Sequence, residues 1–450
     1  PAPPPPPPPP PSPASPPPAS GAAPPSPFQA PATPLPRGGG AIRGIGEKSA
    51  ANPVPGTGSL SVPIAVSHGR AGFGPQLSLS YDSGSGNGPF GFGWSLGLPQ
   101  ITRKTDKGLP RYDDAAESDV FLLSGAEDLV PVAGPDDTTT APGYRIRRYR
   151  PRVEGLFARI ERWTKIDGPD AGDVHWRSIS KDNVLTLYGT DGNSRIADPA
   201  DARRVFTWLV CETRDDRGNA VLYDYKAEDG ADLDLGQAHE ANRGSNADAR
   251  RKVNRYLKHI RYGNRVPLLD GEGRRPPFLT PAQIAAAGWM FQVVFDYGEH
   301  DDDAPTPAEV RSWPRRNDPF STYRPGFEVR TYRLCRRVLL FHHFPDEPDV
   351  RAGCLVRSTD FAYAHEQTPD AARDPVYSFL LSVTQSGYKR DNGGYLKRSL
   401  PPLAFDYTRP VVQGVVEEVD AASPVSYTHL RAHETGLDIV CRLLLEKKKR

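Results

Sequence analysis

Residues 56–106 alternate apolar and polar side chains between glycine-rich turns, and this pattern limits the possible folds more than any other feature of the chain. Within 60–66, and again within 77–81, every second side chain is apolar. Successive side chains of a β-strand point to opposite faces, so each run predicts a strand with one buried face. The glycines of 69–74 and 83–88 supply the backbone conformations that tight turns need. The segment therefore predicts two or three antiparallel strands.

Ten further segments rich in Val, Ile, Phe, Tyr and Trp lie between turn-forming breaks, which is typical of short strands. They are 120–123, 144–149, 157–163, 175–179, 184–188, 205–212, 220–225, 291–297, 328–340 and 403–407. One helix is expected at 280–288, because Thr280 and Gln283 form a capping box around Pro281. Residues 227–254 lack a periodic apolar stripe and predict a long surface loop with partial disorder. The chain is therefore predicted to be all-β and mainly antiparallel.

The charge balance excludes several classes of partner. Lys plus Arg number 56 and Asp plus Glu 55, so the formal net charge is only +1, and no nucleic acid is expected as a partner. No run approaches the roughly 18 apolar residues of a membrane helix, and no signal peptide is visible. The four cysteines, Cys211, Cys335, Cys354 and Cys441, are widely spaced, which predicts buried free thiols rather than disulfides or a zinc site.

Both ends of the chain differ in composition from the part between them. Twenty of the first 36 residues are proline, a density that favours an extended segment without a core. We therefore predict a proline-rich disordered linker over 1–44 and a β domain over 45–425. Residues 426–450 change abruptly to a basic, amphipathic sequence. This tail is interpreted as an aberrant, non-native terminus, with a partner-binding helix as the alternative.

Short motifs that elsewhere carry chemistry lack their required context in this chain. The segment 93–97 (GWSLG) matches the G-x-S-x-G pattern of hydrolases, yet Pro99 blocks the helix that must follow the serine. A hydrolase site is therefore not predicted at this segment. The segment 44–49 (GIGEKS) is similar to a phosphate loop, but glutamate stands where glycine must precede the lysine.

Two polar clusters contain the residue types of metal ligands. His342 and His343 are adjacent, so on a strand they point to opposite faces and only one can face a given metal. Residues 299–303 (EHDDD) lack the glycine and the terminal glutamate of a calcium loop. Both clusters are predicted to be solvated turns. No catalytic, cofactor-binding or metal-binding residue is assigned, no cofactor is expected, and the chain is predicted not to be an enzyme.

Several sequence blocks follow the order of one protein family. Segments 56–66 and 74–103 resemble the opening of the SpvB-type N-terminal domain, found in the B components of bacterial insecticidal toxin complexes (Tc) and in related virulence plasmid B proteins. Later blocks similar to that domain are 119–125, 127–129, 187–189, 203–208, 218–225 and 256–265. Strand ends that resemble the tyrosine-aspartate repeats of β-shell proteins are 79–82, 222–225, 260–263, 294–297 and 404–407. The resemblance extends over about 45–410, and it implies a structural role for 91–99, with Phe92 and Trp94 buried beside glycine turns.

The resemblance implies a structural protein that forms part of a large curved β-shell around a cytotoxic partner polypeptide. Its implied partners are the toxin-complex C component or cargo and the pore-forming A component, with assembly in the bacterial cytoplasm and secretion to the extracellular space. The alternative is the export or docking domain of an ADP-ribosyltransferase whose catalytic module is absent, since the Glu-x-Glu pair of that activity does not occur in the sequence. A cell-surface β-repeat adhesin is a third hypothesis.

Overall fold

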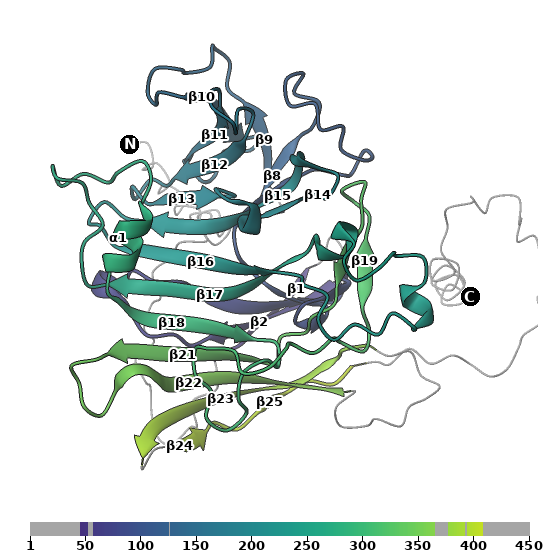
Figure 1. Ribbon diagram of the computed structural model, residues 1–450, viewed down its shortest axis with the longest axis vertical. Helices are drawn as coiled ribbons and strands as arrows, with labels where there is room; N and C mark the ends of the chain where they lie inside the picture. The colour runs from purple at the N-terminus through teal and green to yellow at the C-terminus, as the bar shows by residue number, and fades with distance from the viewer. Residues whose placement is uncertain (1–45, 53–56, 126, 365–376, 392–393, 408–450) are drawn as a thin grey trace, which may run out of the picture. The chain divides into compact units, whose positions relative to one another are not determined.

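Antiparallel strands make up most of the computed structural model, which describes residues 46–52, 57–125, 127–364, 377–391 and 394–407 (Figure 1). The first strands are β1 (Lys48–Asn52), β2 (Thr57–Ile64), β3 (Leu77–Asp82), β4 (Asn87–Gly88), β5 (Gly91–Phe92), β6 (Trp94–Leu96), β7 (Gln100–Arg103), β8 (Phe121–Leu123), β9 (Glu127–Pro131), β10 (Tyr144–Pro151), β11 (Arg159–Lys165), β12 (Val174–Ile179) and β13 (Leu185–Tyr188). The later strands are β14 (Arg195–Asp198), β15 (Asp201–Arg214), β16 (Ala220–Ala227), β17 (Arg255–Asn264), β18 (Trp289–Asp296), β19 (Phe320–Thr322), β20 (Val329–Thr331), β21 (Arg337–Phe344), β22 (Arg351–Tyr363), β23 (Leu380–Asp391), β24 (Gly394–Ser399) and β25 (Leu403–Ala404). The all-β prediction is confirmed.

Eight of these strands close into a barrel. The circuit runs β7-β8-β9-β10-β11-β12-β13-β15 and returns to β7 where Trp208 pairs with Ile101. Inside it, Trp176 and Trp208 are 0% and 1% exposed. The other buried members of this core are Ile101, Phe121, Leu123, Leu129, Tyr149, Ile160, Tyr188, Val205 and Val210. Side chains just fill a barrel of this size, so its interior is a packed core.

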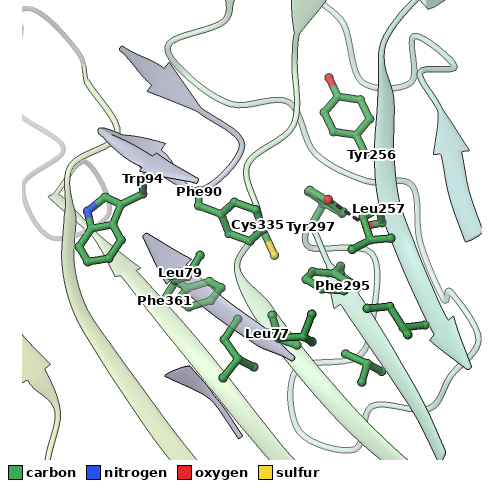
Figure 2. Close-up of a cluster of buried hydrophobic side chains, with 14 of the residues drawn as sticks. Leu77, Leu79, Phe90, Trp94, Tyr256, Leu257, Phe295, Tyr297, Cys335 and Phe361 are labelled. Atoms are coloured by element: carbon green, nitrogen blue, oxygen red, sulfur yellow. Dashed lines mark hydrogen bonds between the residues drawn. The ribbon is translucent and has the colours of Figure 1, made fainter. Parts of the chain in front are cut away.

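A second core, here called the sandwich, lies between two sheets. The second half of β15 pairs with β13 of the barrel and also with β16, and the large sheet continues through β17, β18, β21 and β22 to β23. The smaller sheet β1-β2-β3-β6 packs against one face of it. Leu77 and Leu79 of the small sheet share this core with Phe295 and Phe361 of the large sheet, as Figure 2 shows.

The large sheet is apolar on both faces at its centre. In β21, Val338 and Leu340 belong to the sandwich core, whereas Leu339 and Phe341 lie in a separate cluster on the opposite face. The hairpin of β23 and β24 packs onto this second cluster through tyrosines, and the backbone N–H of Leu355 donates to a tyrosine hydroxyl there at 3.0 Å. A sheet that is covered on both sides explains the uninterrupted apolar run in β21.

The local predictions hold in part up to β18. Segment 56–106 is predicted to form two or three strands but forms six, β2 to β7. Each predicted segment between 120 and 225 overlaps one observed strand, namely β8, β10, β11, β12, β13, β15 or β16, whereas β9, β14 and β17 are not predicted. The expected helix is α1 (Pro281–Ala286), where the Gln283 N–H donates to Thr280 Oγ1 at 3.2 Å and both halves of the capping box are present. Segment 328–340, predicted as one strand, forms two, β20 and β21. Between them Arg333 enters a buried ion pair and the Cys335 N–H donates to Pro89 O instead of a neighbouring strand.

The connection 227–254 carries short 3-10 turns, as a loop is expected to, but it is not wholly a surface segment. Glu228, Glu240 and Arg251 are 1%, 4% and 3% exposed. The prediction of partial disorder overlooked these side chains: Arg251 pairs with Glu240 inside the connection, and Glu228 and Glu240 pair with arginines 105 and 90 residues away. The aromatic residues Tyr81, Tyr223, Tyr225, Tyr262, Phe295, Tyr297 and Phe405 of the repeated strand ends all pack in or against the sandwich core.

Three of the four cysteines, Cys211, Cys335 and Cys354, are buried free thiols as predicted, and Cys441 lies outside the described residues. The predicted linker 1–44 and tail 426–450 also lie outside them, as do residues 44 and 45 of the phosphate-loop-like segment. The described residues 46–407 fall in one compact unit. Across the described stretches, helices are too short or too polar to cross a bilayer.

Candidate functional site

The hydrolase-like serine lies where it has no catalytic neighbours. Ser95 is on the exposed face of β6, and its hydroxyl donates to Ser80 O at 3.5 Å. In the described part of the chain no imidazole or carboxylate hydrogen-bonds to it. Strand β7, not a helix, follows. Trp94 is 2% exposed and its Nε1–H donates to the Tyr407 hydroxyl at 2.7 Å, whereas Phe92 is only half-buried.

The two adjacent histidines have separate surroundings. His342 Nε2 lies 2.8 Å from Ser67 Oγ and its ring contacts Phe291. His343 Nε2 lies 3.1 Å from Gln292 Oε1. Both lie within β21, so they are not the solvated turn that the sequence predicts. Burial lowers the pKa of each imidazole below its ordinary value.

The acidic segment 299–303 departs further from its prediction as a solvated turn. Its last three residues are exposed, but Glu299 and His300 are completely buried. The reason is Lys258 of β17, whose ammonium contacts Glu299 and lies 2.7 Å from His300 Nε2. This partner is 41 residues away from Glu299, so no local pattern indicates it.

Asp296 of β18 and Arg337 of β21 lie beside this group. The Lys258 cluster is defined here as Lys258, Glu299, His300, Asp296 and Arg337. Asp296, at the end of β18, accepts from Arg337 Nε of β21 at 2.7 Å and from the Gly298 N–H at 2.7 Å. Burial alone would raise the pKa of Asp296, but Arg337 and the Gly298 N–H hold it below the ordinary value. Ligand atoms of Asp296, Glu299 and His300 lie within 4.8 Å of one another. In this structure these groups contact protein cations: Lys258 lies against Glu299 and His300, and Arg337 binds Asp296.

Two further buried clusters hold the long connections. Arg333 is 0% exposed and its Nε donates to Glu228 at 3.0 Å, while its Nη1 donates to Trp313 O at 2.7 Å. Glu240 binds Arg330 at 2.7 Å and also contacts Arg251. These pairs join the segment 228–254 to the segment 313–333. Glu240 and Arg330 are 90 residues apart in the sequence, and Glu228 and Arg333 are 105 residues apart. Their arrangement joins loops that are distant in the sequence.

Two concave surfaces occur among the described residues. A groove of about 580 Å³ lies between the β14–β15 turn and the segments around 241–251 and 323–328. Its carboxylates are engaged, Asp198 with Arg204 at 3.0 Å and Glu328 with Arg243 at 2.9 Å. A smaller pocket of about 230 Å³ is lined by Arg315, Arg316 and Arg336 among others. Neither lining contains serine, cysteine or histidine.

These features define an antiparallel β domain whose buried charges fix its connections. The sequence pattern of the family described as "Salmonella virulence plasmid 65kDa B protein" (SpvB) matches residues 52–344. The chain therefore belongs to the SpvB family. Relatives named "Mono(ADP-ribosyl)transferase SpvB" from Salmonella typhimurium (strain 14028s / SGSC 2262) and Salmonella dublin are each 39% identical over 328 residues, 70% of this chain and 51% of theirs. The chain thus spans about half the length of these relatives.

Solved structures show the same relation. The crystal structure of TcdB2-TccC3 is similar at a TM-score of 0.67 and 32% identity, over 84% of this chain and 18% of that chain. The N-terminal domain of effector protein SpvB from Salmonella typhimurium strain LT2 is similar at 0.60 and 35% identity, over 73% of this chain and 98% of that one. A Photorhabdus luminescens Tc holotoxin pore reaches 0.67 at 33% identity, over 83% and 16%. The predicted SpvB-type domain, with a fold related to the Tc β-shell, is confirmed.

Proposed function

We propose that this chain is a structural, non-enzymatic part of a bacterial toxin complex, and that its sheets help to form a shell around a cytotoxic partner polypeptide. The observation that carries the proposal is the likeness to TcdB2-TccC3, in which the matched region is 18% of a much longer chain. The proposed partners are the toxin-complex C component or its cargo, and the pore-forming A component. The complex would be assembled in the bacterial cytoplasm and act as a secreted protein.

The architecture supports a role in containment. The strands from β16 to β23 form a continuous wall, apolar on both faces at its centre and covered on both. Packed apolar rows make such a wall rigid, because protein interiors are as dense as organic crystals. The buried ion clusters lock the long connections onto it, so the charged groups serve stability and not turnover.

Co-expression tests containment directly. The full-length gene is expressed with a toxin-complex C component, and the purified complex is treated with protease. We expect a cargo fragment that co-elutes with the shell and resists digestion, although the same cargo alone is degraded. The variant Val383→Asp, at a core position with 0% exposure, is expected to abolish protection, whereas Ser95→Ala leaves it intact. Equal digestion of the cargo with and without the shell would contradict containment.

A second candidate function follows from the curated relatives, which are named as mono(ADP-ribosyl)transferases and extend to about twice the matched length. In this alternative the chain is the export or docking half of a virulence enzyme. The natural gene would then continue into a module with a Glu-x-Glu pair, and the full-length protein would transfer ADP-ribose from NAD to a host protein. Sequencing of the downstream gene and a radiolabelled NAD assay separate the two candidates.

A further inference from the structure

The segment that follows β18 contacts the sheet through buried charged side chains rather than through strand pairing. Glu299 and His300 are 0% exposed, and Lys258 of β17 is 3% exposed. The Tyr297 N–H donates to Glu299 Oε2 at 2.7 Å, and the Val310 N–H donates to Glu299 O at 2.9 Å. Glu299 therefore links the sheet to both ends of the segment 297–310.

Hydrogen bonds determine which nitrogen of His300 carries the proton. His300 Nδ1 lies 2.9 Å from Thr306 O, and a carbonyl only accepts, so Nδ1 is the donor. His300 Nε2 lies 2.7 Å from Lys258 Nζ, and an ammonium only donates, so Nε2 offers its lone pair. Both contacts are satisfied together only when the imidazole is neutral.

The surrounding charges leave no carboxylate free to accept a second cation. Lys258 contacts Glu299 and lies 3.6 Å from Glu309, which in turn accepts from Lys226 of β16 at 2.7 Å. The cations Lys226, Lys258 and Arg337 stand against the carboxylates Asp296, Glu299 and Glu309, with a neutral His259 on the same strand as Lys258. A fourth cation, Arg311, donates from Nη2 to His300 O at 2.6 Å and pairs with the exposed Asp302 at 2.9 Å.

We propose that this arrangement is an acid-sensitive clamp, in which protonation of His300 Nε2 breaks its hydrogen bond to Lys258 and releases the segment 297–310 from the sheet. A proton on Nε2 would turn an accepting nitrogen into a donor that faces the ammonium, with like charges at hydrogen-bond distance. The clamp would be closed at neutral pH and would open in acid. It is independent of the proposed shell function, because it depends on contacts within this chain alone.

The sign of the effect follows from linkage. Burial, and then the Lys258 ammonium, lower the pKa of His300 below its ordinary value of about 6.5. At a pH between the lowered pKa of the closed state and the ordinary value of about 6.5, His300 is protonated in the open segment and neutral in the closed one. The stability of the closed state is therefore fully present above about pH 6.5 and falls as the pH decreases below it.

Hydrogen exchange of the full chain tests the clamp. Amide protection of peptides covering 297–310 is expected to fall about fivefold between pH 6.5 and 5.5, after correction for intrinsic exchange. In His300→Gln, whose amide oxygen can still accept from Lys258 but gains no proton, that fall should be less than about twofold. Peptides of β2 and β3 report global unfolding, and His343→Gln is the matched control outside the cluster. An equal fall in wild type and H300Q, or none in wild type, would overturn the proposal.

A second variant tests the role of the ammonium. Lys258→Gln removes the opposing ammonium but keeps a hydrogen-bond donor beside Nε2, while Glu299 and Glu309 remain. The pKa of His300, followed by NMR of nitrogen-labelled histidine, is expected below about 6.5 in wild type and higher in K258Q than in wild type. The segment of K258Q would then lose less protection in acid. A His300 pKa that stays equally low in K258Q would refute the role of Lys258.

Discussion

The sandwich buries a larger core than the barrel, and the two regions are held together by different means. In the barrel most strands pair with their neighbours in sequence, and one long-range pairing, β15 with β7, closes the circuit. Its end is held by Arg103, which binds Asp114 and Asp119, only 11 and 16 residues away. In the sandwich, Val62 shares a core with Val383, and the ion pairs between its long connections span 41 to 105 residues. Both regions bury charged side chains, so they differ in how far apart in the sequence the paired charges lie.

The largest expected effect comes from removing one aromatic side chain from either core. Trp176→Ala in the barrel and Phe295→Ala in the sandwich, both at positions with 0% exposure, should each lower the free energy of unfolding by about 3–5 kcal/mol. Hydrogen exchange should locate the loss: W176A loosens residues 100–210, whereas F295A loosens β2 and β3 as well as β17. A uniform loss in both regions would show that the two cores unfold as one unit.

Breaking a long-range buried ion pair should lower the free energy of unfolding by nearly as much as removing a core aromatic side chain. Glu228→Gln leaves Arg333 buried at 0% exposure without its carboxylate, and we expect a loss of about 3 kcal/mol, measured by urea unfolding. The estimate is at the low end because Arg333 keeps the carbonyls of Trp313 and Ala231.

The double variant Glu228→Gln with Arg333→Met should recover part of that loss, since no unpaired charge remains. Arg203→Met is the matched control, because its pair with Asp201 is exposed and should be worth less than about 1 kcal/mol. Equal losses for E228Q and R203M would mean that the buried pair has no special role.

Acid should weaken the sandwich before the barrel. The pKa of His259 is lowered to about 4 by burial and by Lys258, and those of His300, His342 and His343 are also lowered. The outer face of the barrel carries His175, whose pKa is lowered by burial and by Arg177.

Each of these histidines binds a proton at a higher pH in the unfolded chain than in the folded one. The free energy of unfolding therefore falls as the pH drops below about 6.5, by up to about 1.4 kcal/mol per pH unit for each fully buried imidazole. The half-buried His342 and His343 should contribute less. Urea unfolding at pH 7.5 and 5.5, combined with hydrogen exchange, checks the order. Earlier loss of protection in the barrel would contradict it.

The smallest effect is expected at the helix cap. Thr280→Ala removes the hydroxyl that accepts from the Gln283 N–H at 3.2 Å. The free energy of unfolding, measured by thermal unfolding, should fall by about 1 kcal/mol. Thr280→Ser keeps the cap and should be nearly neutral. Because α1 has no buried residue of its own, the change should not spread to the barrel.

Local order could be predicted from the sequence, but long-range pairing could not. The alternation in 60–66 and 77–81 led to β2 and β3, and the Thr280–Gln283 box led to α1, because such signals depend on neighbours a few residues apart. Strand β22 gave a weaker signal, since Gly353 and the charged Arg357 and Asp360 interrupt its apolar residues. The burial of Glu299 and His300 had no local signal at all, because their cation is on another strand.

The chain's own pattern of side chains was enough to establish an antiparallel β protein of the SpvB type with free buried thiols, because strand alternation, turns and sequence blocks are properties of short stretches. Closure of β15 on β7, the packing of the small sheet on the large one, and the assembly of the Lys258 cluster were decided by the folded chain alone. Each of these joins residues that are tens to hundreds of positions apart, and a charge in a sequence does not show which distant charge will be buried against it.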